Sequence, residues 1–297
     1  MRDLGRVVAW MGGALVFFSL MAVSVRELHG ALSVFEILAL RSLGGIALLA
    51  AWAGLVPGAP GLKAIGWPVP LRLHLARNMV HVVAQACWAF GLTLLPLATV
   101  FALEFTAPAW ATLLAVLFLG ERATAGRIGG LALGFLGVLV VLRPGAETFR
   151  ADALVVLAAA LGFAIALVIT KRMTATIGVL TILFWMQVMQ LPMNLGAHLA
   201  LSGGAVPWQG LGLAQAPMAA ALCVSGLMAQ VCVTSAFRHG DAATVVPLDF
   251  LRIPLIAVVG VALYGEPFDG LVLLGAAITG AGILWNLRDA ASRAARG

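Results

Sequence analysis

Charged residues are scarce in this chain of 297 residues, and their scarcity excludes an ordinary soluble domain. Asp, Glu, Lys and Arg make up only 10% of the sequence, whereas a soluble domain carries about 25%. Hydrophobic residues make up 62%, and the mean hydropathy is +1.07. No water-soluble core needs this much apolar sequence, so the composition predicts a protein embedded in a lipid bilayer.

Cysteine and the usual catalytic motifs are also few. Cys87, Cys223 and Cys232 all lie in apolar runs and form no CxxC motif, so we expect neither disulfides nor a metal site. The sequence has no HExxH motif and no GxxxxGKS/T loop, and CVSG at 223–226 lacks the first glycine of a GxSG motif. No cofactor or ATP hydrolysis is therefore expected, and an intramembrane enzyme is the weaker alternative.

The basic excess has no pattern typical of a nucleic-acid-binding protein. The net charge is +6, but no basic stripe carries interleaved aromatic residues, so we expect no nucleic-acid partner. We assign the excess to cytoplasmic loops instead. A cleavable signal peptide is not expected either, because the apolar run from Val7 to Val25 is long enough to span and no A-x-A-like site follows it.

Long apolar runs fill the rest of the chain. A helix needs about 20 apolar residues to cross a hydrocarbon core of about 30 Å. Backbone groups must be paired within lipid, so these runs must be helices. We expect ten spans, roughly at 7–26, 33–55, 73–94, 97–119, 125–142, 153–172, 178–200, 212–237, 242–264 and 270–287.

Lys and Arg residues predict the orientation of these spans. With the N-terminus inside, the outer ends carry only Arg26, Arg143 and Arg150. The inner ends carry 13 basic residues: Arg2, Arg6, Lys63, Arg72, Arg77, Arg122, Arg127, Lys171, Arg172, Arg238, Arg288, Arg293 and Arg296. The positive-inside rule then places both termini in the cytoplasm.

The sequence repeats itself at an offset of 145 residues. At that offset Glu104 falls on Asp249 and Gln85 on Gln230, and the Gly-Glu pair at 120–121 falls on the pair at 265–266. We therefore divide the chain into two units, 1–145 and 146–297. Each unit holds five spans, an odd number, so the second unit is inverted in the membrane. The predicted fold is an all-α membrane protein of ten transmembrane helices in two inverted five-helix repeats, an arrangement typical of secondary transporters.

Several phrases resemble a known family. They are FEILALRSLGG in the second span, FTAPAWATLLAVLFLGE followed by GRIGGLALGFLGVLVVLRPG, and DFLRIPLIAVVGVALYGEP followed by LLGAAITGAGILW. The chain is similar over nearly its whole length to the EamA group of the drug/metabolite transporter superfamily. The resemblance implies a bacterial inner-membrane carrier that works by alternating access around a central cavity. Members export amino acids and other metabolites, and some import solutes such as S-adenosylmethionine or riboflavin.

Two carboxylates inside spans are the first candidates for a functional site. A charge within a span costs about 2.5–3.5 kcal/mol on insertion scales and usually faces the bundle interior. Glu104 and Asp249 are therefore candidate proton sites or ligands for a substrate amine, unless each is locked in an ion pair. Arg252 follows Asp249 by three residues and can pair with it. For Glu104 we expect Arg41 as the partner, because both lie roughly 11–12 Å below the outer ends of their spans.

Further polar and aromatic side chains complete the expected site. Gln85, Gln230 and His81 could contact substrate or link helices, and Trp88 and Trp110 could line the cavity. The charges of Glu104, Asp249, Arg41 and Arg252 sum to zero, which favours a zwitterion such as an amino acid. The expected function is a secondary carrier of such a small molecule, with a proton or another ion as the candidate coupling ion. Uptake of a cofactor-like solute is the alternative, and a channel is disfavoured because no filter is visible.

Glycines in the fifth predicted span indicate close helix packing. Gly126, Gly130 and Gly134 have GxxxG spacing, and Gly275, Thr279 and Gly282 echo it in the tenth span. The fifth and tenth spans can meet within one chain or between two chains, which leaves a homodimer open.

The predicted topology can be tested with reporter fusions. Fusions after Gly297 and within 59–66 should report a cytoplasmic location, and fusions near 146–150 should report the outside. A cytoplasmic signal at 146–150 would rule out an inverted repeat, because five spans could not then precede that segment.

Overall fold

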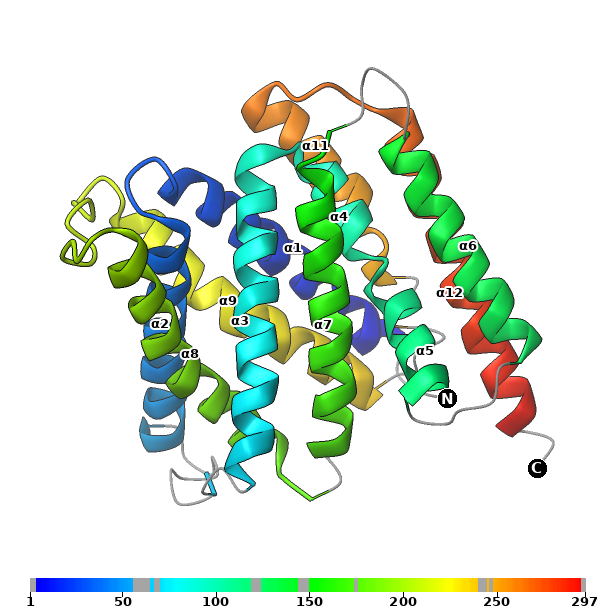
Figure 1. Cartoon of the computed structure of the whole chain (residues 1–297), viewed down its shortest axis with the longest axis horizontal. Coiled ribbons are helices and arrows are strands. Elements are labelled where there is room, and N and C mark those ends of the chain that lie inside the picture. Colours follow the sequence, from blue (N-terminus) through cyan, green and yellow to red (C-terminus); the bar gives the residue numbers. More distant parts are fainter. Residues whose placement is uncertain are drawn as a thin grey trace.

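The computed structural model describes an all-helical chain (Figure 1) over residues 4–55, 65–66, 70–118, 124–143, 150–173, 176–239, 245 and 248–294. The helices of the first half are α1 (Leu4–Leu28), α2 (Val34–Leu55), α3 (Leu71–Leu94), α4 (Leu97–Glu104), α5 (Ala107–Phe118) and α6 (Ala125–Leu142). Those of the second half are α7 (Ala153–Met173), α8 (Val179–Leu201), α9 (Ala216–His239), α11 (Arg252–Tyr264) and α12 (Gly270–Ala294).

The apolar composition of these helices makes the chain a multi-pass membrane protein. Seven segments of the described residues are long and apolar enough to cross a bilayer: Leu4–Leu28, Val34–Gly54, Leu97–Leu114, Ala125–Leu142, Ala153–Thr170, Ala216–Ala236 and Gly270–Asp289. Helix α11 is apolar but shorter. Helices α3 and α8, which the sequence also predicts as spans, carry more polar side chains, and several of these face the interior cavity described below.

The helix boundaries repeat at the offset that the sequence predicts. Helices α2, α3, α5 and α6 begin at residues 34, 71, 107 and 125, and α8, α9, α11 and α12 begin at 179, 216, 252 and 270. Each second number exceeds the first by 145. The two repeats therefore have one helical design. One predicted match, the Gly-Glu pair at 120–121, lies outside the described residues.

The last helices of the two repeats pack side by side, as the green α6 and the red α12 show in Figure 1. A Cβ added to Gly130 would lie 2.7 Å from the carbonyl oxygen of Gly282, and one added to Gly137 would lie 2.5 Å from that of Gly275. The residue numbers run in opposite directions along the contact, so α6 and α12 are antiparallel. Because Gly275 is the equivalent of Gly130 and Gly282 that of Gly137, a two-fold axis relates the two contacts. The repeats are therefore inverted, and the glycines serve a contact within the chain.

Two spans predicted as continuous are broken instead. The span at 97–119 divides into α4 and α5 at Phe105–Thr106, and the span at 242–264 has a turn at 250–251 before α11 begins. Pro108 has no N–H to bond the carbonyl of residue 104, and Pro254 has none to bond that of residue 250. Each proline thus lies in the first turn of a new helix, where a missing N–H costs little. The breaks place Glu104 and Asp249 at the ends of helical segments in the interior.

The glycine contact between α6 and α12 predicts that a larger side chain at residue 137 destabilises the protein. In Gly137→Ala the new methyl group would lie 2.1 Å from Thr279 Oγ1 and 2.5 Å from the Gly275 carbonyl, so one helix must shift. We expect a loss of about 1–3 kcal/mol in the free energy of unfolding, measured as a lower midpoint in detergent. Gly196→Ala in α8 is the matched control, since nothing lies within 4 Å of its added Cβ. Equal midpoints for the two variants would contradict this packing.

Candidate functional site

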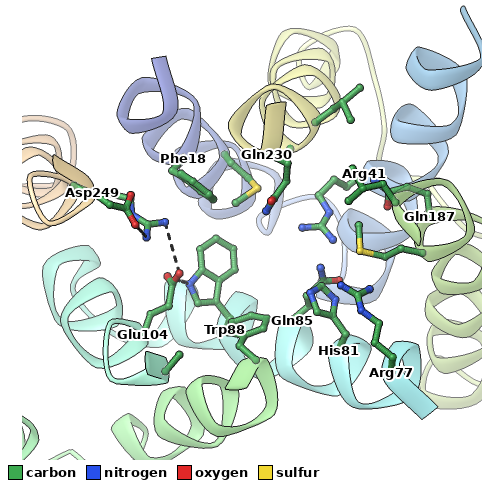
Figure 2. A pocket seen from close by; sticks show the side chains of 18 of the residues that line it. Phe18, Arg41, Arg77, His81, Gln85, Trp88, Glu104, Gln187, Gln230 and Asp249 are labelled. Atoms are coloured by element: carbon green, nitrogen blue, oxygen red, sulfur yellow. Dashed lines mark hydrogen bonds and ion pairs between the residues drawn. The ribbon is translucent and has the colours of Figure 1, made fainter. Parts of the chain in front are cut away.

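A cavity of about 330 Å³ lies between the two repeats and is lined by side chains from both (Figure 2). Its volume is near the lower end of the range of about 300–1,000 Å³ typical of small-molecule sites. Most of the predicted site residues line it: Arg41, His81, Gln85, Trp88, Glu104, Gln230, Asp249 and Arg252. The fold thus brings together residues that are as much as 211 positions apart, from Arg41 to Arg252.

Trp110 is an exception, and its predicted place in the cavity wall is wrong. Its ring packs edge-on against Phe135 of α6, with ring centroids 4.8 Å apart. Trp110 follows the break between α4 and α5. The direction of α5 after this break cannot be predicted from the helical periodicity of the sequence. Pro108, two residues earlier, still lines the cavity.

One end of the cavity is built around Arg252. Its guanidinium lies 3.1 Å from Asp249 Oδ2 and 3.6 Å from Glu104 Oε1, and its side chain is only 6% exposed. Trp88 Nε1 donates a hydrogen bond of 2.7 Å to Glu104 Oε2. The predicted pairing of Asp249 with Arg252 is therefore confirmed, and Arg252 also binds the equivalent carboxylate of the other repeat.

Three phenylalanine rings surround the same guanidinium. Its central carbon lies 4.2 Å from the ring centroid of Phe18, 4.7 Å from that of Phe105 and 5.3 Å from that of Phe101. A cation over an aromatic face is attracted by the ring, most strongly where water is excluded. Arg252 is therefore stabilised by rings from α1, from α4 and from the α4–α5 break as well as by the two carboxylates.

The predicted pairing of Glu104 with Arg41 is wrong. Arg41 lies across the cavity from Glu104 in Figure 2, and its Nε is buried without a hydrogen-bond partner. The predicted pairing depended on the similar depths of the two residues along their own helices. Depth gives the height in the bundle and says nothing about lateral separation, and the break after Glu104 brings Arg252 closer.

A second polar group lies around Arg41 at the other end of the cavity, with Arg77, His81, Gln85 and Gln187 (Figure 2). Arg77 is only 7% exposed. The sequence predicts a place for it among the basic residues at the cytoplasmic ends of the spans, where an exposed side chain is expected. Arg77, His81 and Gln85 are four residues apart, so they share one face of α3. That spacing was the signal in the sequence that could have placed Arg77 in the cavity. We call Arg41 and Arg77 the basic pair.

Hydrogen bonds among α3, α7 and α8 hold this region in place. Arg77 Nε donates to Thr170 Oγ1 at 3.2 Å, and Arg77 Nη1 donates to Asn78 Oδ1 at 3.0 Å. Gln190 Nε2 lies 3.0 Å from His81 Nδ1 and donates to Asn78 Oδ1 at 3.2 Å. These contacts fix the polar face of α3 toward the cavity. Across the described residues, no three His, Cys, Asp or Glu side chains gather as a metal site requires.

Ion pairs join the helices at the end of the molecule that the basic residues predict to be external. Arg26 forms an ion pair with Glu266 and donates to the Leu92 carbonyl at 2.8 Å, and Glu266 accepts from the Leu97 N–H at 2.9 Å. Arg143 lies 2.5 Å from Asp269. Burial raises the pKa of Asp269, but hydrogen bonds from Arg143 and the Leu271 N–H outweigh it, so the pKa is below its ordinary value.

The cavity itself extends toward the opposite, predicted cytoplasmic end. Leu49 and Leu183 line it, six residues before the end of α2 and four residues after the start of α8. The conformation thus combines an interior cavity that reaches toward one end with ion pairs at the other. Such asymmetry is what a carrier with one accessible side requires.

The different partners of the buried arginines predict different effects on stability. Arg252→Gln leaves two carboxylates without their cation and should cost about 3–5 kcal/mol in the free energy of unfolding. Arg41→Gln removes no described partner and should cost much less. Both can be compared by thermal unfolding in detergent, with the exposed Arg150→Gln as a control expected to change stability by less than about 1 kcal/mol. A loss for Arg41→Gln as large as that for Arg252→Gln would contradict these assignments.

Comparison with known proteins agrees with this architecture. The EamA-like transporter family matches residues 5–143 and 151–288, one match for each repeat. A solved crystal structure of a protein aligns over 96% of this chain and 98% of its own length, with a TM-score of 0.63 and 18% identity, a likeness that shows the fold.

Curated relatives are bacterial transporters. The chain is 34% identical to a riboflavin transporter of Rhizobium johnstonii over 77% of this chain and 74% of that protein. It is 26% identical to an S-adenosylmethionine uptake transporter of Rickettsia bellii over 69% of each. A pseudopaline exporter of Pseudomonas aeruginosa is 27% identical over 87% of each. With both repeats matched, the chain belongs to the EamA-like transporter family.

Proposed function

We propose that the protein carries a small organic solute with a flat heterocyclic ring, and that riboflavin and S-adenosylmethionine are the solutes to test first. The observation that carries this proposal is the aromatic wall of the cavity, formed by Phe18, Trp88, Phe105 and Phe163. Aromatic side chains offer large flat contact areas, and stacking a heterocyclic base on such a ring is worth about 1–3 kcal/mol. The names of the riboflavin and S-adenosylmethionine relatives support the same class of solute.

An amino acid, our first expectation, is less well supported. That expectation depended on four intramembrane charges that sum to zero. Arg77 adds a third buried guanidinium to the cavity lining, so the set is no longer balanced. The four aromatic side chains also exceed what a small zwitterion needs for recognition. An amino-acid substrate therefore remains only as an outcome of the transport test.

Transport would proceed by alternating access. Two inverted repeats can exchange conformations, which moves access from one end of the cavity to the other without moving the site. We propose uptake across the bacterial inner membrane with both termini in the cytoplasm, the direction named for the S-adenosylmethionine relative. The pseudopaline relative is named an exporter, so direction is part of the test.

The test is uptake in a riboflavin-auxotrophic bacterium that lacks its own flavin importer. Expression of this chain should restore growth on low riboflavin, and cell-associated flavin fluorescence should rise. Parallel uptake of labelled S-adenosylmethionine and labelled amino acids identifies the other candidates. Phe163→Leu keeps apolar volume but removes a ring from the cavity wall, and we expect uptake to fall about tenfold or more. Phe184→Leu is the matched control, because Phe184 packs against Trp185 on α8 outside the cavity lining.

Three results would overturn the proposal. They are uptake of amino acids alone, uptake of none of the solutes by cells that contain the protein in the membrane, and equal effects of Phe163→Leu and Phe184→Leu.

We propose Glu104 as the carrier of a coupling proton. Its oxygen lies 3.6 Å from Arg252, farther than that of Asp249 at 3.1 Å, so Glu104 is the more loosely paired carboxylate. In the same uptake assay, Glu104→Gln should abolish accumulation driven by a pH gradient while solute exchange continues. Unchanged dependence on the gradient in that variant would exclude Glu104 as the proton site.

A further inference from the structure

Positions that line the cavity come in pairs, because residues 145 apart occupy equivalent places in the two repeats. Both members of three such pairs line the cavity and keep the same kind of side chain: Phe18 with Phe163, Gln85 with Gln230, and Glu104 with Asp249. Side chains that both repeats keep belong to the framework that the two halves share.

Basic side chains break this symmetry at one end of the cavity. The equivalent places in the second repeat hold an apolar side chain or none: Met186 for Arg41, Leu222 for Arg77 and Gly226 for His81. Met186 and Gly226 line the same cavity as their counterparts. The repeated architecture therefore folds without cations at these places, so the basic residues of the first repeat need a separate explanation.

Arg41 is positioned but has no partner. Its stem crosses α9 at Gly226, where an added Cβ would lie only 3.0 Å from Arg41 Cγ and Cδ. Figure 2 shows its guanidinium directed into the cavity. No hydrogen bond or ion pair links this guanidinium to another described residue, and Arg41 Nε is buried. The close passage at Gly226 thus presents a free planar fork to whatever occupies the cavity.

Arg77 lies in the same region and keeps donors to spare. A guanidinium has five N–H donors, and the contacts to Thr170 and Asn78 engage only Nε and Nη1. Both contacts are to neutral oxygen atoms, so they hold the side chain without neutralising its charge.

The distribution of charge in the cavity is therefore unbalanced. Three guanidiniums, from Arg41, Arg77 and Arg252, face two carboxylates, from Glu104 and Asp249. Both carboxylates contact Arg252, so within the described lining the basic pair has no carboxylate of its own. A buried cation without a counter-charge is costly unless a ligand supplies the negative group.

We propose that Arg41 and Arg77 bind an oxyanion group, a carboxylate or a phosphate, of the transported solute, an inference that rests on the proposed transport function. The planar guanidinium fork matches both kinds of oxyanion, because two parallel N–H groups can bond two oxygens. The ring of the solute then lies toward Trp88 and Phe18, and its anionic group lies at the basic pair. Of two solutes with the same ring, the protein selects the one with the oxyanion.

Two matched pairs of ligands test this selection by equilibrium binding to the purified protein. Riboflavin and riboflavin 5′-phosphate differ only in a phosphate, and S-adenosylmethionine and its decarboxylated analogue differ only in a carboxylate. In at least one pair, the oxyanion-bearing member should bind about tenfold or more tightly. The flavin pair reports a phosphate and the other pair a carboxylate, so the results identify the kind of oxyanion.

Variants of the basic pair decide whether these residues cause the preference. Arg41→Gln should reduce it about tenfold or more, and Arg41→Lys should retain part of it because the charge stays but the fork is lost. Arg150→Gln, at an exposed pair with Asp152, should leave it unchanged. Arg77→Gln provides a second reading of the same site, and thermal unfolding identifies any variant that has lost its fold.

Equal binding within both pairs, or a preference that Arg41→Gln and Arg77→Gln leave intact, would overturn this inference while the proposed function stands. Binding of none of the four compounds would overturn the proposed function and this inference with it.

Discussion

The Arg252 guanidinium lies between two carboxylates, one from each repeat, and the interior of the protein is arranged around it. Glu104 ends the first half of one broken span, and Asp249 precedes the break in the other. Buried charges are costly unless they are paired, so this contact holds the two breaks against each other. Phe18 and Phe105 enclose the guanidinium and also form part of the cavity wall. The same interaction thus joins the repeats and bounds the site.

Some features of this molecule follow the inverted symmetry of the two repeats, and others depart from it. The glycine contact between α6 and α12 and the paired positions of the cavity follow the two-fold relation between the repeats. A symmetric framework provides two equivalent conformations, as alternating access needs. Arg41 and Arg77 have apolar equivalents in Met186 and Leu222, so the oxyanion site that we propose is a place where the two halves differ.

Much of the fold could be predicted from the sequence, because bilayer length and the 145-residue offset constrain the helices strongly. The helix breaks could not, since a proline in an apolar run is compatible with a bend or with a new first turn. The pairing of Glu104 was wrong because helix depth carries no lateral information. Arg77 was missed because a basic residue near the end of a span resembles a loop charge. Trp110 was misplaced because the break re-aims the helix that carries it.

We infer that the solute binds in the cavity between the repeats. Thiol labelling tests it directly, in a variant without the native cysteines that carries Leu227→Cys in the cavity lining. Riboflavin or S-adenosylmethionine, whichever is taken up, should slow maleimide labelling at residue 227 at concentrations that saturate uptake. Leu213→Cys, at a position 94% exposed, should react at an unchanged rate. Unchanged labelling at residue 227 during saturated uptake would show that the solute does not bind in this cavity.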